Sequence, residues 1–191
     1  MYLSGAKYQG MFIQDDVLNL RAAEPSDAAV IYQWENDMQI WRVSDTIMPY
    51  SMHQIEQFLM NNTDLYSQKQ LRIMIELKEK KQAAGCIDFY DFDPFHERIG
   101  IGILIASEYR GRHIALNALK LSEQYIFGHL HLNQIYCLIG EDNQASLQLF
   151  SKAGYSQCGI RKAWLKTPKG FMGQYEFQKI NPDRRFQFIV Q

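Results

Sequence analysis

The sequence predicts an α/β (α+β) fold, in which a mixed sheet of about seven strands is flanked by four helices. The chain has 191 residues, 47% of them hydrophobic, which is enough to form one core without disulfides. Strand and helix patterns follow each other as one strand, two helices, three strands, a helix, a strand, a helix and two closing strands. No repeat or linker-like segment divides the chain. We therefore expect a single domain over residues 1–191, with an N-terminal arm at 1–14 and a C-terminal tail at 181–191.

The first strand and the first two helices open the chain. Residues 17–22 (VLNLRA) alternate apolar and polar side chains, as a half-buried strand does. Pro25 and Asp27, with Ser26 as a cap, then start an amphipathic helix with the sequence AAVIYQWEND. Ser51 begins a second helix, SMHQIEQFLM, whose apolar residues fall on one face.

The middle of the chain combines strands with one long helix. A strand is expected at 71–77 (LRIMIEL), and two more at 84–92 and 99–106 are joined by the turn DPFHER. Residues 111–127 show the apolar spacing of a helix. The short strand at 134–139 (QIYCLI) is apolar on both faces, which is typical of a buried parallel strand.

The last three elements complete the sheet. Residues 143–152 form a short helix that ends before Gly154, a residue type favoured just after a helix. Two strands are expected around 155–166 and 171–180.

Charge and cysteine content exclude several classes of function. With 20 basic and 21 acidic side chains the formal net charge is −1, so we expect neither a nucleic acid nor an anionic membrane as partner. Cys86 and Cys137 lie in apolar runs and are read as small buried hydrophobes, and with Cys158 they show no disulfide or metal-site spacing. The start of the chain lacks the apolar segment of a secretory signal, and no run approaches the roughly 18 apolar residues of a membrane span. We expect a cytoplasmic protein.

The most informative segment is residues 101–120, IGILIASEYRGRHIALNALK. A hydrophobic strand runs through a short polar turn into Arg110-Gly111-Arg112-His113 and then directly into a helix. This order leaves unpaired backbone N–H groups at the first helical turn, which together with the helix dipole bind phosphate or pyrophosphate. The two arginines can add charge-assisted contacts. The glycine lets the chain turn sharply beside the ligand.

This segment resembles the pyrophosphate loop of the GNAT acetyltransferases, written Gln/Arg-x-x-Gly-x-Gly/Ala. Arg110 fills its first place and Ala115 its last, whereas His113 stands where the middle glycine is usual. A second stretch, residues 140–155 (GEDNQASLQLFSKAGY), is similar to the strand-loop-helix that follows in the family. The residues in register there are Asn143, Ser146, Lys152, Gly154 and Tyr155. The resemblance covers roughly residues 17–180 and is nearest to the RimJ/RimL-type branch.

The resemblance implies the GNAT fold, with its sheet splayed between the fourth and fifth strands, and acetyl-CoA as cosubstrate. It implies an oxyanion-stabilising backbone N–H on the fourth strand. The residues expected to bind acetyl-CoA are Ile103, Leu104, Ile105, Arg110, Gly111, Arg112, His113, Ile114, Ala115 and Asn143. His113 either meets a phosphate oxygen or is a surface residue at a helix start. No metal is expected.

The catalytic and substrate residues are less constrained. Phe150 stands where many relatives carry a tyrosine that protonates the departing thiolate, so Ser146 is the candidate acid, against the alternative that it is only a helix residue. Glu35 and Asp88 are candidate contacts for a substrate cation. Trp41 is another, unless it belongs to the core. The base is open among Glu35, Asp88, Asp91, Asp93, His96, Glu97 and an ordered water.

The resemblance implies an N-acetyltransferase that transfers an acetyl group to a primary amine, on a protein or peptide N-terminus or on a small molecule. A spermidine or polyamine acetyltransferase is an alternative. An alternative of another class is a catalytically inactive CoA-binding homologue, suggested by His113 and Phe150. The tail at 181–191 can also pair with a partner strand, so a homodimer is kept open.

Overall fold

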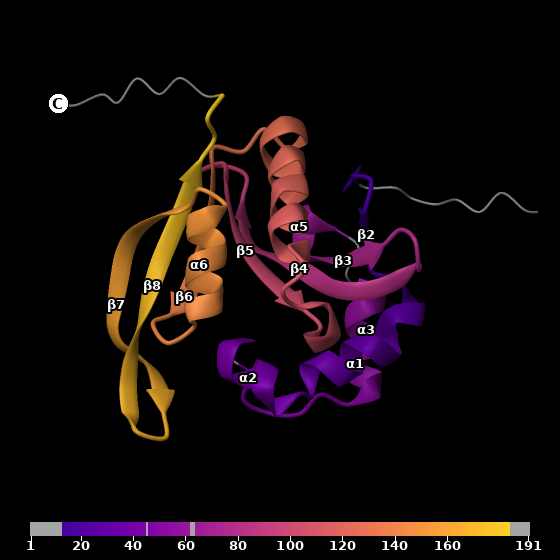
Figure 1. The fold of residues 1–191 in the computed structure, drawn as a ribbon, viewed down its shortest axis with the longest axis horizontal. Helices are drawn as coiled ribbons and strands as arrows, with labels where there is room; N and C mark the ends of the chain where they lie inside the picture. Colours follow the sequence, from indigo (N-terminus) through magenta and orange to yellow (C-terminus); the bar gives the residue numbers. More distant parts are fainter. Residues whose placement is uncertain (1–12, 45, 62–63, 184–191) are drawn as a thin grey trace, which may run out of the picture.

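The computed structural model describes residues 13–44, 46–61 and 64–183, and these form one eight-stranded sheet with helices on both faces (Figure 1). The strand order is β1-β2-β3-β4-β5-β6-β8-β7. All neighbours are antiparallel except β5 and β6, which are parallel. The mixed α/β sheet predicted from the sequence is therefore confirmed. The strands are β1 Ile13–Gln14, β2 Leu18–Ala22, β3 Leu71–Leu77, β4 Gln82–Asp93, β5 Arg98–Ile105, β6 Gln134–Gly140, β7 Ser156–Thr167 and β8 Gly170–Ile180.

The described residues contain six α-helices, of which four were expected. The expected ones are α1 Ala28–Glu35, α3 Met52–Asn61, α5 Ile114–Glu123 and α6 Gln144–Lys152, and the additional ones are α2 Met38–Ser44 and α4 Leu65–Gln68. The two additional helices have seven and four residues, too short for a helical period to be recognised in the sequence. No helix in the described residues is long and apolar enough to span a membrane.

Several expected boundaries are wrong in detail. The sheet has eight strands rather than about seven, because Ile13–Gln14 of the expected arm at 1–14 pairs with β2. The helix expected at 111–127 begins at Ile114 and changes to a π-helix at Gln124–His129. At the other end, Asn181 of the expected tail is buried and donates its side-chain amide to the carbonyl of Leu132 at 3.0 Å. The rest of the tail, from 184 on, and the arm up to 12 lie outside the described residues.

Local capping explains where the first helices begin. Ser51 precedes α3 and makes a reciprocal cap: its hydroxyl accepts from the N–H of Gln54 at 3.2 Å, and its own N–H donates to the Gln54 side chain at 2.8 Å. The expected cap at Ser26 is wrong. The turn before α1 is instead closed by Asp27, whose carboxylate accepts from the N–H of Glu24 at 2.8 Å, because Asp27 is buried and Ser26 is exposed.

Two hydrophobic clusters hold the helices to opposite faces of the sheet. The larger packs α5 and α6 against one face, and its fully buried residues include Ile87, Phe89 and Leu119. The smaller packs α1 and α3 against the other face, around Ile31 and Met74. With helices on both faces, β5 and β6 lie in the middle of the sheet.

β5 and β6 diverge in the middle of the sheet. They pair only between residues 98–100 of β5 and 134–136 of β6. Beyond this point, residues 101–105 of β5 stay with β4 and residues 137–140 of β6 stay with β8. In Figure 1 the two halves of the sheet accordingly spread apart, with α5 lying over β4 and β5 and α2 toward the open end. The splay expected between the fourth and fifth strands lies here.

Candidate active site

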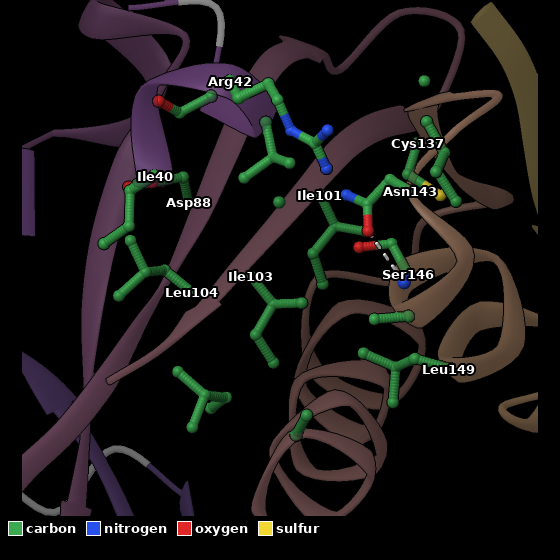
Figure 2. A pocket seen from close by; sticks show the side chains of 18 of the residues that line it. Ile40, Arg42, Asp88, Ile101, Ile103, Leu104, Cys137, Asn143, Ser146 and Leu149 are labelled. Carbon is green, nitrogen blue, oxygen red and sulfur yellow. Dashed lines mark hydrogen bonds between the residues drawn. The ribbon is translucent and has the colours of Figure 1, made fainter. Parts of the chain in front are cut away.

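The splay opens into a cavity of about 1,260 Å³. Its walls come from both diverging strands, from the N-terminal ends of α5 and α6, and from α1, α2 and α3. Figure 2 shows Ile101 and Ile103 of β5 on one side of it, and Cys137 of β6 with Asn143 and Ser146 from the start of α6 on the other. A cavity of this size at the edge of two diverging strands suits a ligand larger than a simple metabolite.

Two backbone N–H groups of β5 face the open side of the splay. Along an antiparallel pair of strands, every second residue directs its N–H and C=O toward the partner strand, and the residues between direct theirs away. Ala106 donates its N–H to the carbonyl of Ala84 at 2.9 Å, so Leu104 also directs its N–H toward β4. By the same alternation the N–H groups of Ile103 and Ile105 point away from β4, toward the side from which β6 has diverged. These two groups are therefore placed to donate to a ligand, whereas Leu104 lines the cavity with its side chain.

The turn before α5 presents a row of backbone N–H groups without partners. Gly111 has φ +75° and His113 has φ +61°, both in the left-handed region. His113 is the N-cap of α5, and its side chain makes no capping hydrogen bond. No described residue accepts from the N–H groups of 111–115. Such groups at the positive end of a helix dipole are satisfied by an anion, so the turn fits the phosphates of a coenzyme.

Arg110 and His113 of this turn line the cavity, whereas Arg112, which was also expected to bind the coenzyme, does not. Arg110 lines the cavity, but its Nε donates to the carbonyl of Ile105 at 3.0 Å and so fixes the turn to the end of β5. Arg112 is exposed, stacks over the ring of Tyr109 at 5.8 Å and is not among the cavity-lining residues. His113 is exposed at the cavity rim. Its left-handed backbone explains why the family pattern has glycine at this place.

Asn143 and Ser146 lie together at the start of α6. The Asn143 side-chain oxygen accepts from the N–H of Ser146 at 3.2 Å and caps the helix. Both residues line the cavity, and Figure 2 shows them side by side at its edge. Phe150, one of the cavity-lining residues, is 3% exposed and meets the ring of Tyr155 edge-on at 5.0 Å. The cap thus belongs to Asn143, and the Ser146 hydroxyl is left facing the cavity.

An arginine that the sequence reasoning missed joins Glu35 and Asp88, two candidate bases and substrate contacts. Arg72 of β3 contacts Glu35 at 2.5 Å and holds Asp88 through two bonds, at 2.6 and 2.8 Å. Its guanidinium also lies over the ring of Phe58, 5.4 Å from the centroid. Burial opposes a charge here, but Asp88 and the other neighbouring acids raise the pKa of Arg72 above its ordinary value. Glu35, Arg72 and Asp88 thus form one ion-pair cluster, named here the Arg72 cluster.

Trp41 and four of the candidate bases lie elsewhere. The indole of Trp41 donates to the carbonyl of Glu35 at 2.6 Å, and Trp41 is not among the cavity-lining residues. The indole thus holds the end of α1, and a contact of Trp41 with substrate stays a prediction. The candidate bases that do not line the cavity are Asp91, Asp93, His96 and Glu97. Asp91 accepts from the hydroxyl of Tyr136, and Asp93 closes the β4–β5 turn.

Tyr90 lies where β5 and β6 begin to separate. Its ring covers Gly100 so closely that a Cβ at that glycine would come within 2.2 Å of a ring atom. Burial raises the pKa of its phenol, an effect that the nearby backbone N–H of Leu138 opposes. Tyr90 alternates with Asp88 on the same face of β4 and lines the cavity with it. The strand register pairs Tyr90 with Gly100, the last residue of β5 that pairs with β6, and so places this side chain at the vertex of the splay, where the two strands separate.

A second ion pair reaches across the mouth of the splay. Arg42 of α2 contacts Asp142, in the turn before α6, at 3.2 Å, and both residues line the cavity. The Arg42 side chain is 68% exposed, so this pair contributes little to stability. Within the described residues, no group of three or more His, Cys, Asp and Glu side chains is arranged to hold a metal ion.

The comparisons with known proteins agree with this geometry. Residues 18–156 match the family model of the acetyltransferase (GNAT) domain. Spermidine N(1)-acetyltransferase of Escherichia coli K12 is 26% identical over 144 residues, covering 73% of each chain.

Two solved structures share the fold. Spermidine N-acetyltransferase from Vibrio cholerae, in complex with CoA and spermine, has a TM-score of 0.79 at 20% identity and covers 87% of this chain and 97% of its own. Ribosomal-protein-S5-alanine acetyltransferase from Vibrio fischeri also has a TM-score of 0.79, at 18% identity, and covers 91% and 98%.

The splayed sheet and the anion-binding turn at the start of α5 are thus found in a chain most of which matches one family model. The donor of the acetyl group in that family is acetyl-CoA, and the cavity has room and backbone donors for it. On this evidence the chain belongs to the GNAT acetyltransferase family.

Proposed function

We propose that this acetyltransferase transfers an acetyl group directly from acetyl-CoA to a primary amine, on a peptide N-terminus or a small molecule. The observation that carries the proposal is the cavity in the splay. At one end it has the unpaired N–H groups of 111–115, along one wall the N–H groups of Ile103 and Ile105, and at the other end the Arg72 cluster. This order of groups supports a phosphate end, a thioester segment and an amine end.

Each end of the cavity supports one part of the reaction. The turn at 111–115 supplies donors for the coenzyme phosphates, and Arg110 holds that turn in place. Attack of the neutral amine on the thioester carbonyl places negative charge on its oxygen, which an N–H of Ile103 or Ile105 can stabilise. Asn143 is the proposed contact for the pantetheine arm, because its side-chain oxygen caps α6 while its side-chain nitrogen donates to none of the described residues.

Proton transfer completes the step. Collapse of the tetrahedral intermediate breaks the carbon–sulfur bond, and the departing thiolate takes up a proton. Ser146 is the proposed donor, because its hydroxyl faces the cavity while its N–H is held by Asn143. Glu35 and Asp88 already accept hydrogen bonds from Arg72. We therefore assign removal of the amine proton to a water beside them.

A polyamine is the second candidate acceptor. The E. coli relative that is 26% identical over 144 residues is named a spermidine acetyltransferase, and this favours spermidine. A peptide N-terminus is the acceptor that the RimJ/RimL-type branch suggests. The V. fischeri structure, which is named for alanine acetylation of ribosomal protein S5, has the same fold at 18% identity. The two candidates predict different preferences among amines.

A panel of amines tests the proposal. The protein is incubated with acetyl-CoA and alkylamines, spermidine, or peptides with free N-termini, and the released CoA thiol is followed with a chromogenic disulfide. We expect amine-dependent release with at least one class. Binding of acetyl-CoA without release for any amine would instead identify a catalytically inactive homologue that only binds the coenzyme.

We also propose a compartment and an assembly state. The three cysteines are free thiols, two of them buried, which suits the cytoplasm. For a homodimer, Trp164 and Phe171 offer exposed aromatic surface on the β7–β8 hairpin, and β7 is an edge strand of the sheet.

A further inference from the structure

We infer that Arg72 sets the charge of the acceptor: the amine end of the cavity takes a primary amine with one positive charge and an apolar body, rather than a polyamine. The inference rests on the proposed function and names the substrate class of the same site.

The first step is the charge of the Arg72 cluster. Two carboxylates, Glu35 and Asp88, share one guanidinium, which leaves a formal net charge of −1. The side chains of Arg72 and Glu35 are 13% and 15% exposed, so solvent screens their pairing weakly. The Asp88 side chain is 38% exposed and so presents the accessible face of the cluster to the cavity. One incoming ammonium balances this charge.

The second step is that the pairing is fixed. Asp88 is held by two parallel bonds from Arg72, a geometry that a fork-shaped guanidinium makes with a carboxylate. The two residues are also direct partners in the register of β3 and β4. Phe58 packs on the guanidinium from α3. A polycation would have to displace this arginine to reach both carboxylates.

The third step is the remaining charge near the acceptor end. Arg42 and Asp142 pair with each other and add no net charge. Counting both pairs, the five side chains carry three negative and two positive charges, again −1. The additional ammonium groups of spermidine would therefore lie beside two guanidinium groups and only one unbalanced carboxylate, in a cavity that Arg110 also lines.

The fourth step is the apolar wall. α2 and α3 line the cavity with Met38, Ile40, Val43, Ile55 and Phe58. Met38 is 77% and Val43 is 50% exposed, so this wall offers accessible apolar surface to a ligand in the cavity. An acceptor with an apolar body covers this wall, whereas the charged nitrogens of a polyamine do not.

Binding of hexylamine and spermidine to the CoA-bound protein tests the inference, with isothermal titration as the readout. The wild-type protein is expected to bind hexylamine at least tenfold more tightly than spermidine. Arg72→Met, which leaves a net charge of −2, is expected to reduce or reverse this ratio by at least tenfold. Arg98→Met is the matched control, because Arg98 forms an exposed pair with Asp93 outside the cavity, and it should keep the wild-type ratio.

A second variant covers the case in which Arg72→Met does not fold. Asp88→Asn removes one negative charge but keeps Glu35 as partner for Arg72, and it should weaken spermidine more than hexylamine. Tighter binding of spermidine than hexylamine by the wild type, or an unchanged ratio in both cluster variants, would overturn the inference. Its failure is distinct from failure of the proposed function, which would show as amine binding without release of CoA.

Discussion

Replacing Ser146 with alanine separates a chemical role for its hydroxyl from a structural one. The N–H of Ser146 is the group that Asn143 caps, and alanine keeps it. Alanine is also the better helix former, by about 0.5 kcal/mol, so α6 should be as stable as before. Only the hydroxyl that faces the cavity is lost. We therefore expect the free energy of unfolding to change by less than about 1 kcal/mol.

The expected loss is in the rate. A general acid contributes about 10²- to 10⁴-fold, so kcat should fall at least about 10²-fold, equivalent to about 2.7 kcal/mol. The Kd for acetyl-CoA should stay within about threefold, or about 0.7 kcal/mol. The assay is steady-state release of CoA thiol at saturating acetyl-CoA, with Kd measured separately by isothermal titration.

Ser151→Ala is the control, because Ser151 lies on the same helix, is exposed and does not line the cavity. It should have wild-type kcat. An unchanged kcat in Ser146→Ala would refute the assignment and leave water as the proton donor. Equal losses of rate and of acetyl-CoA affinity would instead place Ser146 in coenzyme binding.

Three further predictions concern the turn before α5 and the sheet. Gly111→Val should weaken acetyl-CoA at least tenfold by titration calorimetry, because φ +75° disfavours a β-branched residue and its side chain enters ligand space; wild-type affinity would contradict this. His113→Gly should raise Tm, since the left-handed φ costs a non-glycine residue about 1–2 kcal/mol, and should leave the Kd for acetyl-CoA within about threefold at pH 6 and pH 8. A loss of affinity in the His113→Gly variant that occurs only at pH 6 would indicate a phosphate contact. Burial, together with Asp91, raises the pKa of Tyr136 to about 12, so the fold favours the neutral phenol. The stability that Tyr136 contributes should therefore be complete below pH 10 and decline between pH 10 and 12, measured by urea unfolding. Tyr136→Phe should reduce that decline.

The parts of the fold that follow from local pattern were predictable. Alternation placed the strand at 71–77, and the glycine-containing turn with two arginines placed the start of α5 to within a few residues. Backbone N–H groups form the anion site at this turn, so the site could be predicted although His113 departs from the family pattern. Its left-handed φ is consistent with the glycine that the family pattern has at that place.

The parts that depend on register were not predictable. Arg72 is a polar residue in an alternating strand, and only the pairing of β3 with β4 brings it against Asp88. Tyr90 reaches the vertex because the residue opposite it on β5 is Gly100. Trp41 was read as a substrate contact because no pattern revealed the short α2 that turns its indole toward Glu35. Single-sequence periodicity carries no information about such cross-strand and interhelix partners.

The central claim is that the coenzyme lies in the splay with backbone N–H groups as its donors. An NMR titration of ¹⁵N-labelled protein with CoA tests this directly. The amide signals of residues 111–115, and of Ile103 and Ile105, should shift together and saturate at one Kd in the micromolar range, roughly −8 kcal/mol. Amides at 156–160 on β7, at the far edge of the sheet, should stay in place. Saturable shifts centred on another surface, with the signals of 111–115 unmoved, would contradict the account.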